Sequence, residues 1–502
     1  MHPRLRLILS GVLLFLSFPP IGWWPLVFVA LTPAFLALRG VGFWVGFRRG
    51  FLLGFTFWLF LWSWLIPFVN FWSKSNWLGI VPWVLLSIVL SLYYALFGGI
   101  TGIVTQRTRW PLYLIIPSIW VLAEYLRSYW PLGGLPWALL GTSLYQSPLL
   151  IQPASLGGVW LLSFGIALFN VMLFSFRKMN RTELASFGIV IGMLFAYSLG
   201  WLTANPKHKI EVAVMQTGID QAYYHRTQQI HGDIETTMLS MLSSLPPKTN
   251  NIPRIAIFPE SVSPVDPYEV AEWRQALASH AKNADWIIFG SHRGNDKKYS
   301  NMVVLLAKDG SIADSYTKVR LVPFGEYVPY RNEIPFLSTF NVLELDATPG
   351  KTYNPLKAGS EAIGTPICFE SLYPDVSRSM TLNGAQFFAF LINDDWFDRP
   401  TRWLHAMAAP IRAVETARPV VQVTPTGISM LITSNGRMNT LPSGQVSHVE
   451  TMSTNKYNRL TPYVRFGDWV IYGSALLLLG SITIGRKRKE TAEDSEVSVN
   501  EV

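Results

Sequence analysis

Eight apolar runs dominate this chain and limit what it can fold into. Each is long enough, or nearly so, to cross about 30 Å of bilayer hydrocarbon as a helix. They cover residues 5–18, 22–38, 51–69, 78–104, 111–127, 159–176, 184–202 and 467–485. Composition agrees, because 50% of the 502 residues are hydrophobic and 15% are charged, whereas globular proteins carry about 25% charged residues. We therefore expect a polytopic helical membrane domain with eight spans.

The first run could instead be a signal peptide, since Arg4 and Arg6 precede the apolar stretch "LILSGVLLFLSF". No small-residue cleavage site follows it. The next residues are "PPIGWWPL", and a second apolar run begins at once. This order favours an uncleaved first span.

Basic residues are distributed unevenly between the short loops. With a cytoplasmic N-terminus, the cytoplasmic side would receive Arg4, Arg6, Arg39, Arg48, Arg49, Arg107, Arg109, Arg177, Lys178, Arg181 and the "RKRK" segment at 486–489. The opposite side would receive Lys74, with Arg127 at a boundary. The positive-inside rule then places both termini in the cytoplasm and the polar region before the last span outside.

Three regions follow from this topology. We expect residues 1–205 to form a membrane domain of seven transmembrane helices, 206–460 an outer domain, and 461–502 the eighth helix with a cytoplasmic tail. Much of the net charge of +9 sits in the loop clusters. No basic stripe interleaved with aromatic residues crosses the polar region, so we expect no nucleic-acid partner.

The polar region alternates short apolar runs with helical stretches, which predicts an α/β fold. Helices are expected near 224–244, 267–281 and 402–417. Strands are expected at 210–219, 254–261, 285–293, 302–312, 361–370, 387–397 and 419–434. Sites in such folds form beyond the ends of strands.

Two features of the membrane half have alternative interpretations. The uncharged loop "SYWPLGGLPWALLGTS" at 128–143 is either an interfacial aromatic belt or a re-entrant segment that faces the outer domain. Glu124 and Arg127 have the i,i+3 spacing of a pair on one helix face. Ionisable groups in a span suggest function, although a pair this close to the interface could be structural.

Three chemical groups stand at or just beyond the ends of apolar runs: Glu260 in "IFPES", Lys318 in "SYTKVRLVP" and Cys368 in "PICFES". Cys368 is the only cysteine, and a free cysteine is often a small buried hydrophobe. A carboxylate and an ammonium favour the alternative, a nucleophile with Glu260 as general base and Lys318 as oxyanion stabiliser. The backbone N–H of Phe369 is a candidate second oxyanion donor.

These three motifs resemble the Glu–Lys–Cys triad of the nitrilase superfamily, a resemblance that implies an αββα sandwich. With eight spans around such a domain, the chain is similar to the bacterial apolipoprotein N-acyltransferases. "LVPFGEYVP", "CFESLYP", "NDDWF" and "GLPW" carry that likeness over nearly the whole chain. The sequence departs from the family pattern in "TGIDQAYYHRT", where a tryptophan is common, and at Pro425, where asparagine is usual.

The resemblance implies supporting roles for further residues. Glu326 would hold the lysine or contact the amine substrate, and Glu370 and Trp396 would line the site. Each also has a structural interpretation: Glu326 as a loop carboxylate paired with Arg320, Glu370 as an acceptor for backbone donors, and Trp396 as a core residue. The histidines have no metal-binding spacing and one thiol cannot build a cysteine zinc site, so we expect neither metal nor cofactor.

The resemblance implies a function in lipoprotein maturation. An acyl group from a phospholipid would pass through a Cys368 thioester to the N-terminal diacylglyceryl-cysteine of an apolipoprotein, in a ping-pong reaction. The enzyme would lie in the bacterial inner membrane with its catalytic domain on the periplasmic side. The alternatives are a membrane-anchored nitrilase-like amidase that hydrolyses a C–N bond, and a transporter or scaffold whose outer domain only binds lipid.

Overall fold

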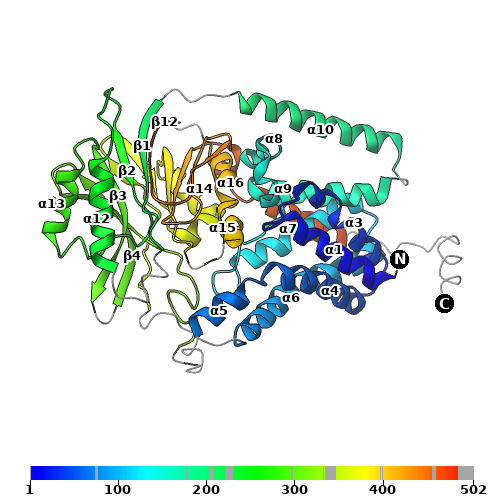
Figure 1. The fold of residues 1–502 in the computed structure, drawn as a ribbon. Coiled ribbons are helices and arrows are strands. Elements are labelled where there is room, and N and C mark those ends of the chain that lie inside the picture. Colours follow the sequence, from blue (N-terminus) through cyan, green and yellow to red (C-terminus); the bar gives the residue numbers. More distant parts are fainter. Residues whose placement is uncertain are drawn as a thin grey trace, which may run out of the picture. The chain divides into compact units, whose positions relative to one another are not determined.

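The structure is a computed structural model that describes residues 2–73, 77–176, 179–203, 208–220, 230–295, 298–331, 333, 346–395, 397, 399–454 and 460–483. The chain divides into two compact units, which are drawn together in Figure 1. The helical unit comprises Met1–Arg127, Ser163–Ala185 and Asp468–Val502. The sheet unit comprises Ser128–Leu162 and Ser186–Gly467.

Helices follow the apolar runs of the sequence. They are α1 (Pro3–Ser17), η1 (Trp24–Leu26), α2 (Val27–Ala30), α3 (Thr32–Leu38), α4 (Phe43–Leu61), α5 (Leu65–Ser73), α6 (Ile80–Arg107), α7 (Leu112–Tyr129), α9 (Ala154–Ser175), α10 (Arg181–Leu202) and α18 (Trp469–Thr483). Among the described residues, α6, α9 and α10 are the three helices long and apolar enough to cross a membrane. The helical character of the apolar runs is thus confirmed, whereas eight spans are not.

The third apolar run, 51–69, is not one helix. It is divided between α4 and α5, and α4 begins earlier than expected, at Phe43. The helix therefore includes Arg48 and Arg49, which the distribution of basic residues assigns to a loop. Arg49 remains compatible with this position because its Nη1 donates to the carbonyl of Ala37, 2.5 Å away in the last turn of α3, where a helix leaves its carbonyls without partners.

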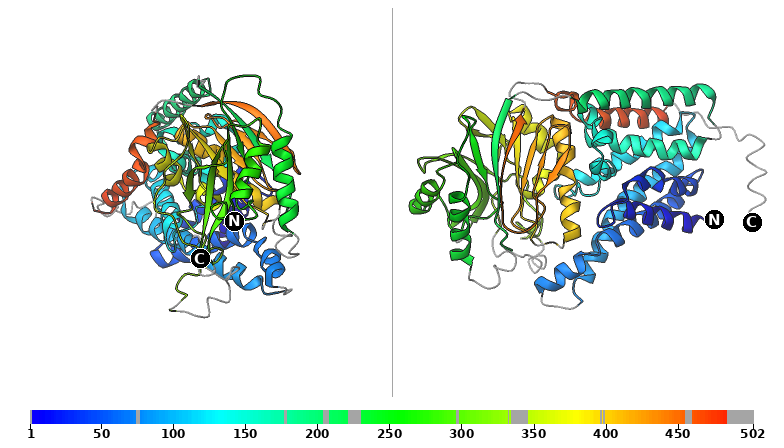
Figure 2. Two further views of the ribbon diagram at one scale, coloured as in Figure 1. Left: turned by 90° about the vertical axis from the view of Figure 1, so that its left-hand side faces the viewer. Right: turned by 45° about the horizontal axis from the view of Figure 1, so that its top comes forward.

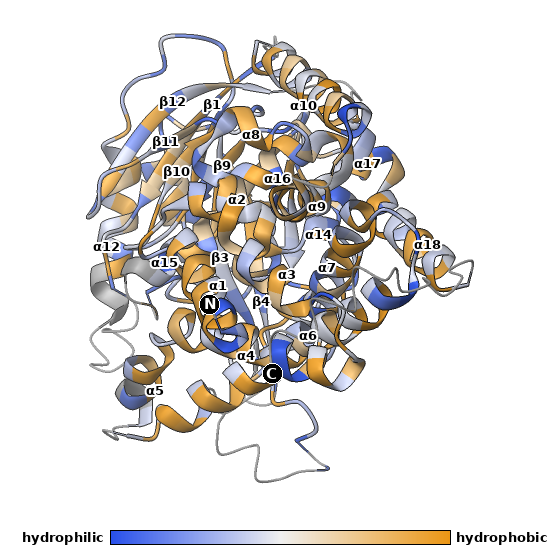
Figure 3. Ribbon diagram, turned by 90° about the vertical axis from the view of Figure 1, so that its right-hand side faces the viewer, coloured by the Kyte–Doolittle hydropathy of each residue, from blue (hydrophilic) through white to orange (hydrophobic). Residues whose placement is uncertain are grey.

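Helices α4 and α6 touch backbone to backbone through glycine. A Cβ added to Gly50 would lie 2.1 Å from the carbonyl oxygen of Tyr94, and one added to Gly46 would lie 2.3 Å from that of Gly98. Both helices are largely apolar (Figure 3). Small residues at four-residue spacing are how apolar helices pack closely in lipid, where no hydrophobic force drives them together.

Two six-stranded sheets form the centre of the sheet unit. The first has the order β12-β1-β2-β3-β4-β5 and the second the order β11-β10-β9-β8-β7-β6. The first contains β1 (His208–Gln216), β2 (Arg254–Ile257), β3 (Trp286–Asn295), β4 (Lys298–Ala307), β5 (Ile312–Thr317) and β12 (Val446–Thr454). The second contains β6 (Leu356–Ala358), β7 (Glu361–Gly364), β8 (Phe387–Leu391), β9 (Val420–Val423), β10 (Met430–Ile432) and β11 (Met438–Thr440).

Helices cover the outer face of each sheet. Figures 1 and 2 show α12 (Ile230–Ser243) and α13 (Ala271–His280) on the first sheet, and α14 (Pro374–Leu382), α15 (Arg399–Ala406) and α16 (Ala408–Thr416) beside the second. The α/β prediction is confirmed. Strand β8 is buried along its whole length, as expected for a strand covered on both faces. The helix expected at 402–417 is two helices, α15 and α16.

Strand directions bring particular strand ends to one edge. In the first sheet, β1, β2 and β3 are parallel. Strand β4 is antiparallel to both β3 and β5, so β5 runs in the same direction as β3. The carboxyl ends of β2 and β5 therefore share an edge with the beginning of β4. In the second sheet, β7, β8 and β9 are parallel, so the loops after β7 and β8 also leave together. These ends carry the candidate site.

The glycine contact gives a first prediction. Gly50→Ala should destabilise the protein by about 1–3 kcal/mol, because the new methyl group overpacks the contact with α6. Gly192→Ala in α10, where nothing lies within 4 Å of the added Cβ, is the matched control, and helix propensity alone should leave it neutral or slightly more stable. Thermal unfolding of the purified variants measures both. Equal stability of the two would contradict the proposed close packing.

Candidate active site

Three loops of the sheet unit bring the expected triad together. Glu260 follows β2, Lys318 follows β5 directly, and Cys368 opens the short helix η5 (Cys368–Leu372) after β7. Glu260 and Lys318 are buried, and Cys368 is partly exposed. The charges of Glu260 and Lys318 both act on the Cys368 thiol. The structure therefore brings the thiol, the carboxylate and the ammonium together.

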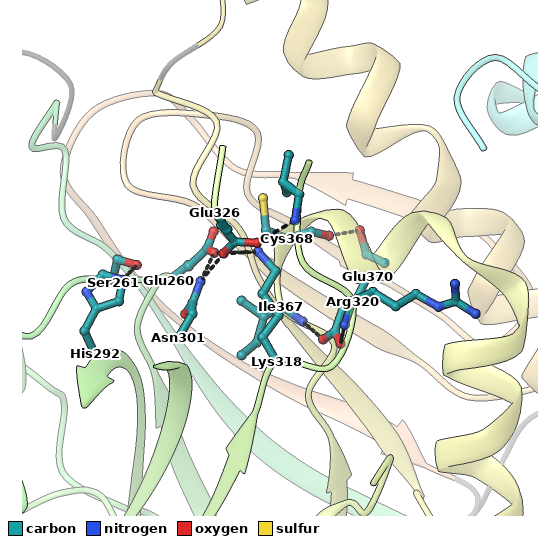
Figure 4. A network of polar contacts seen from close by, with 12 residues as sticks. Glu260, Ser261, His292, Asn301, Lys318, Arg320, Glu326, Ile367, Cys368 and Glu370 are labelled. Atoms are coloured by element: carbon teal, nitrogen blue, oxygen red, sulfur yellow. Dashed lines mark hydrogen bonds and ion pairs between the residues drawn. The ribbon is translucent and has the colours of Figure 1, made fainter. Parts of the chain in front are cut away.

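A network of polar contacts holds the two carboxylates around the ammonium (Figure 4). Lys318 Nζ lies 2.8 Å from Glu326 Oε1 and 3.4 Å from Glu260 Oε1. Asn301 Nδ2 donates to the same two oxygens, at 2.8 Å for Glu260 and 3.0 Å for Glu326. The second oxygen of Glu326 accepts from the backbone N–H of Val322 at 2.8 Å. Glu326 thus holds the lysine and is not paired with Arg320, whose ion pair is to another carboxylate.

Burial controls the electrostatics of this network. Burial raises the pKa of Glu260, and the charge of Glu326 adds to the rise, while Lys318 opposes it. Burial acts to lower the pKa of Lys318, but Glu326 and Glu260 overcome it, so that this pKa lies well above its ordinary value. Burial raises the pKa of the Cys368 thiol well above its usual range, and the charge of Glu260 adds to the rise. The resting thiol is therefore protonated, and a base must take its proton before it can attack.

Local geometry explains why Glu260 reaches this position. The chain passes so close to β3 that a Cβ on Gly290 would lie 2.4 Å from the Ser261 nitrogen and 2.5 Å from Glu260 Cα. Only glycine allows that approach. Ser261 has φ of 54° and Cys368 has φ of 49°, both in the left-handed region. For residues other than glycine such conformations cost of order 1–3 kcal/mol, and they concentrate at functional sites.

Glu370 is completely buried and ties the lysine loop to the cysteine loop. Its carboxylate accepts from the backbone N–H groups of Val319 at 2.8 Å, Arg320 at 3.0 Å and Ile367 at 2.9 Å, and from Tyr316 Oη. Burial raises its pKa, and the three backbone donors oppose that rise. Glu370 therefore acts on the site through the main chain on both sides.

The remaining predicted residues have different outcomes. Phe369 is buried, and its ring lies 5.1 Å from that of Tyr373. Trp396 lies outside the described residues.

The loop at 128–143 contacts the catalytic loops within the sheet unit, because Tyr373 Oη donates to the carbonyls of Gly133 and Gly134 at 3.0 and 3.1 Å.

Several site residues were not found from the sequence. Asn301 sits early in β4, where it looks like one polar residue at the start of an apolar strand. Asp394 and His405 form a buried pair, Nδ1 to Oδ1 at 2.8 Å, behind the cysteine. Asp394 lies within "NDDWF", one of the motifs that carry the family likeness, but nothing in the sequence pairs it with His405 or brings either to Cys368.

One group among the described side chains has the composition of a metal site. The donor atoms of Cys368, Asp394 and His405 lie within 4.8 Å of one another. Both imidazole nitrogens are already hydrogen-bonded, however: Nδ1 to Asp394, and Nε2 to Ser371 Oγ at 3.0 Å and the Cys368 carbonyl at 3.1 Å. A metal would have to replace these bonds, so we assign none here.

Two family profiles match the chain. Residues 212–447 match the carbon-nitrogen hydrolase family, and residues 10–172 match the apolipoprotein N-acyltransferase N-terminal domain. The fold and the thiol–carboxylate–ammonium site thus define the sheet unit as a nitrilase-like enzyme domain. The chain as a whole belongs to the apolipoprotein N-acyltransferase family, and the expectation of an enzyme of that family is confirmed. The apolar helices agree with a bacterial membrane protein.

Individual relatives extend over most of the chain. The apolipoprotein N-acyltransferase of Geobacter metallireducens is 31% identical over 461 residues, covering 86% of each chain. That of Thermotoga maritima is 28% identical over 499 residues, covering 97% of this chain and 94% of the relative. A solved carbon-nitrogen hydrolase from Helicobacter pylori G27 has a TM-score of 0.34 and 16% identity, covering 54% of this chain and 94% of its own.

The buried ion network gives a second prediction. Lys318→Ala should cost about 3–5 kcal/mol of stability at neutral pH, because it leaves the carboxylates of Glu260 and Glu326 buried without a cation. The deficit should shrink as the pH falls, since a protonated carboxyl no longer repels its neighbour. Lys248→Ala is the control: its ion pair with Asp285 is part-exposed, and such pairs contribute about 0–1 kcal/mol. Thermal unfolding across pH tests this, and equal effects of the two substitutions would contradict it.

Proposed function

We propose that this protein transfers an acyl group from a phospholipid to the N-terminal amine of the diacylglyceryl-cysteine of an apolipoprotein, through a thioester on Cys368. The observation that supports it is the clustering of Cys368, Glu260 and Lys318 at one place in the sheet unit (Figure 4), in a chain of the apolipoprotein N-acyltransferase family. Covalent catalysis of this kind replaces one difficult transfer with two easier ones.

The first half-reaction forms the thioester. Glu260 takes the thiol proton, and the Cys368 sulfur attacks the ester carbonyl carbon. The C–S bond forms, the ester C–O bond breaks, and the proton on Glu260 passes to the departing lysophospholipid oxygen. Lys318 Nζ and the backbone N–H of Phe369 stabilise the oxyanion of the tetrahedral intermediate. The raised pKa of Glu260 suits this exchange, because a base works best when its pKa lies closer to the working pH.

The second half-reaction uses the lipoprotein amine. The amine attacks the thioester carbonyl, its proton passes through Glu260 to the departing sulfur, and an amide forms while the free thiol returns. Glu326, which holds Lys318 and Asn301, keeps the ammonium in place through both steps. Trp396 is proposed as a further residue lining the site.

The membrane location has an energetic reason. Both substrates carry long acyl chains, and moving each buried CH₂ into water costs about 0.8 kcal/mol. We propose eight spans in the bacterial inner membrane, with residues 1–205 as the membrane domain and 461–502 as the last span and tail. Residues 206–460 are then the catalytic domain on the periplasmic side, and both termini are cytoplasmic, as the loop charges favour.

Acyl-enzyme formation gives the third prediction. Incubation with phospholipid alone should add the mass of one acyl group to the intact protein, and hydroxylamine should remove it, because a thioester is labile to that nucleophile. Cys368→Ala should carry no adduct. His448→Gln, which alters a part-exposed histidine–glutamate pair on β12, should be acylated like the wild type. An adduct that persists without Cys368 would overturn the assignment of the nucleophile.

The choice of acceptor gives the fourth prediction and separates transfer from hydrolysis. A pre-formed acyl-enzyme should be discharged at least about tenfold faster by a diacylated lipopeptide with a free N-terminus than by water, because water must be excluded from the thioester for transfer to dominate. The same lipopeptide with an acetylated N-terminus is the control. Equal discharge in buffer alone, with hydrolysis of a simple amide substrate, would favour the amidase alternative.

A further inference from the structure

A buried histidine–aspartate pair stands directly behind the nucleophile and takes no part in the reaction described above. His405 comes from α15 and Asp394 from the loop after β8. Both are almost inaccessible to solvent, at 3% and 0% exposure. His405 Nδ1 lies 2.8 Å from Asp394 Oδ1. On the other side of the ring, Nε2 lies 3.1 Å from the carbonyl oxygen of Cys368.

The hydrogen-bond partners determine the charge of this imidazole. The Asp394 carboxylate and the Cys368 carbonyl can only accept hydrogen bonds. Ser371 Oγ lies 3.0 Å from Nε2, but its own hydrogen is donated to the Cys368 carbonyl at 2.7 Å, so it too presents a lone pair to the ring. Each nitrogen therefore faces acceptors, and a neutral ring would set a lone pair against one of them. The arrangement favours an imidazolium.

This cation and its counter-ion lie close to the sulfur. Cys368 Sγ, a carboxylate oxygen of Asp394 and a ring nitrogen of His405 are within 4.8 Å of one another. The indole of Trp137, 6.3 Å from the imidazole between ring centres, also packs against it. In a setting with so little water, charges at this distance act strongly on a thiol.

We propose that His405 is a positioning residue for Cys368. The imidazolium, held by Asp394, hydrogen-bonds to the carbonyl oxygen of Cys368 and so fixes its left-handed backbone conformation. It also neutralises the charge of Asp394, which would otherwise oppose formation of the thiolate. This inference deepens the proposed function, since it assigns a support to the proposed nucleophile. It does not need the acyl transfer itself to be correct, because the state of the thiol is measurable without any lipid substrate.

All charges around the sulfur enter this balance. Glu260 from the loop after β2, Glu326 from the loop after Lys318, and Asp394 from the loop after β8 each raise the pKa of Cys368, and Lys318 at the end of β5 lowers it. Asp394 and Glu260 in turn raise the pKa of His405 against the effect of burial. Three carboxylates, one ammonium and the imidazolium surround the thiol, so loss of the imidazolium adds one uncompensated negative charge.

The single cysteine makes the test direct. Alkylation by iodoacetamide, a small neutral probe, is followed by intact mass in the purified full-length protein from pH 7 to pH 9. Its rate depends on the thiolate fraction. Each unit by which a thiol pKa rises lowers the rate below that pKa by about three- to tenfold, once the gain in nucleophilicity is included. An uncompensated carboxylate at this distance should shift the pKa by about one unit or more.

His405→Gln should therefore slow alkylation by about three- to tenfold across this range. Asp394→Asn, which removes the opposing anion, should not slow it. The double variant His405→Gln/Asp394→Asn should return close to the wild-type rate, because both charges are then removed together. His448→Gln, in a part-exposed pair with Glu450, is the matched control and should leave the rate unchanged.

A purely structural role would produce another pattern. Equal slowing by His405→Gln and Asp394→Asn, with further slowing in the double variant, would overturn the proposal, as would an unchanged rate in a folded His405→Gln protein. If His405→Gln does not fold, Asp394→Asn and the double variant still decide: a rate well below wild type in either contradicts the charge balance. Failure of acyl transfer with this alkylation pattern intact would count against the proposed function alone.

Discussion

The site depends on one buried cation between two buried carboxylates. Lys318 is about as inaccessible as a core leucine, and a charge so placed is tolerated only with partners in direct contact. Glu326 and Glu260 supply them, and Asn301 bridges the same oxygens from the neighbouring strand. The arrangement has a chemical consequence: burial, and then the charge of Glu326, keep the pKa of Glu260 raised although Lys318 opposes the rise, and the thiol is its neighbour. Stability and reactivity of the site therefore have the same physical origin.

The second constraint is the conformation of the nucleophile. The backbone of Cys368 has a left-handed conformation, which is strained for a residue other than glycine. Neighbouring groups must therefore hold it in this conformation. Glu370 binds the backbone N–H of the residue before it, while Ser371 and His405 bind its carbonyl oxygen. These contacts come from the cysteine loop and from α15, and Glu370 also binds the backbone that follows the lysine. The thiol is presented by a main chain fixed on both sides, which is the preorganisation that nucleophilic catalysis requires.

Part of this organisation could be predicted from the sequence. The apolar runs predicted helices, and the alternation of apolar strands with helical stretches predicted the α/β domain, because both patterns follow from local periodicity. The three reactive residues were found since each stands at the end of such a run. The division of the third apolar run into α4 and α5 was missed, as was the glycine contact between α4 and α6, because both depend on what a helix meets and not on its own hydropathy.

The sequence by itself determined the type of chemistry and its setting: one cysteine leaves one possible thiol nucleophile, and the apolar runs require a membrane or an extensive core. Only the tertiary structure decided which carboxylate faces the thiol, which one holds the lysine, and that Asp394 and His405 lie behind the nucleophile. Asn301 is 41 residues from Glu260, and His405 is 37 residues from Cys368. No local pattern encodes such contacts, because they arise from strand order and burial, and burial is also what sets the charges of these groups.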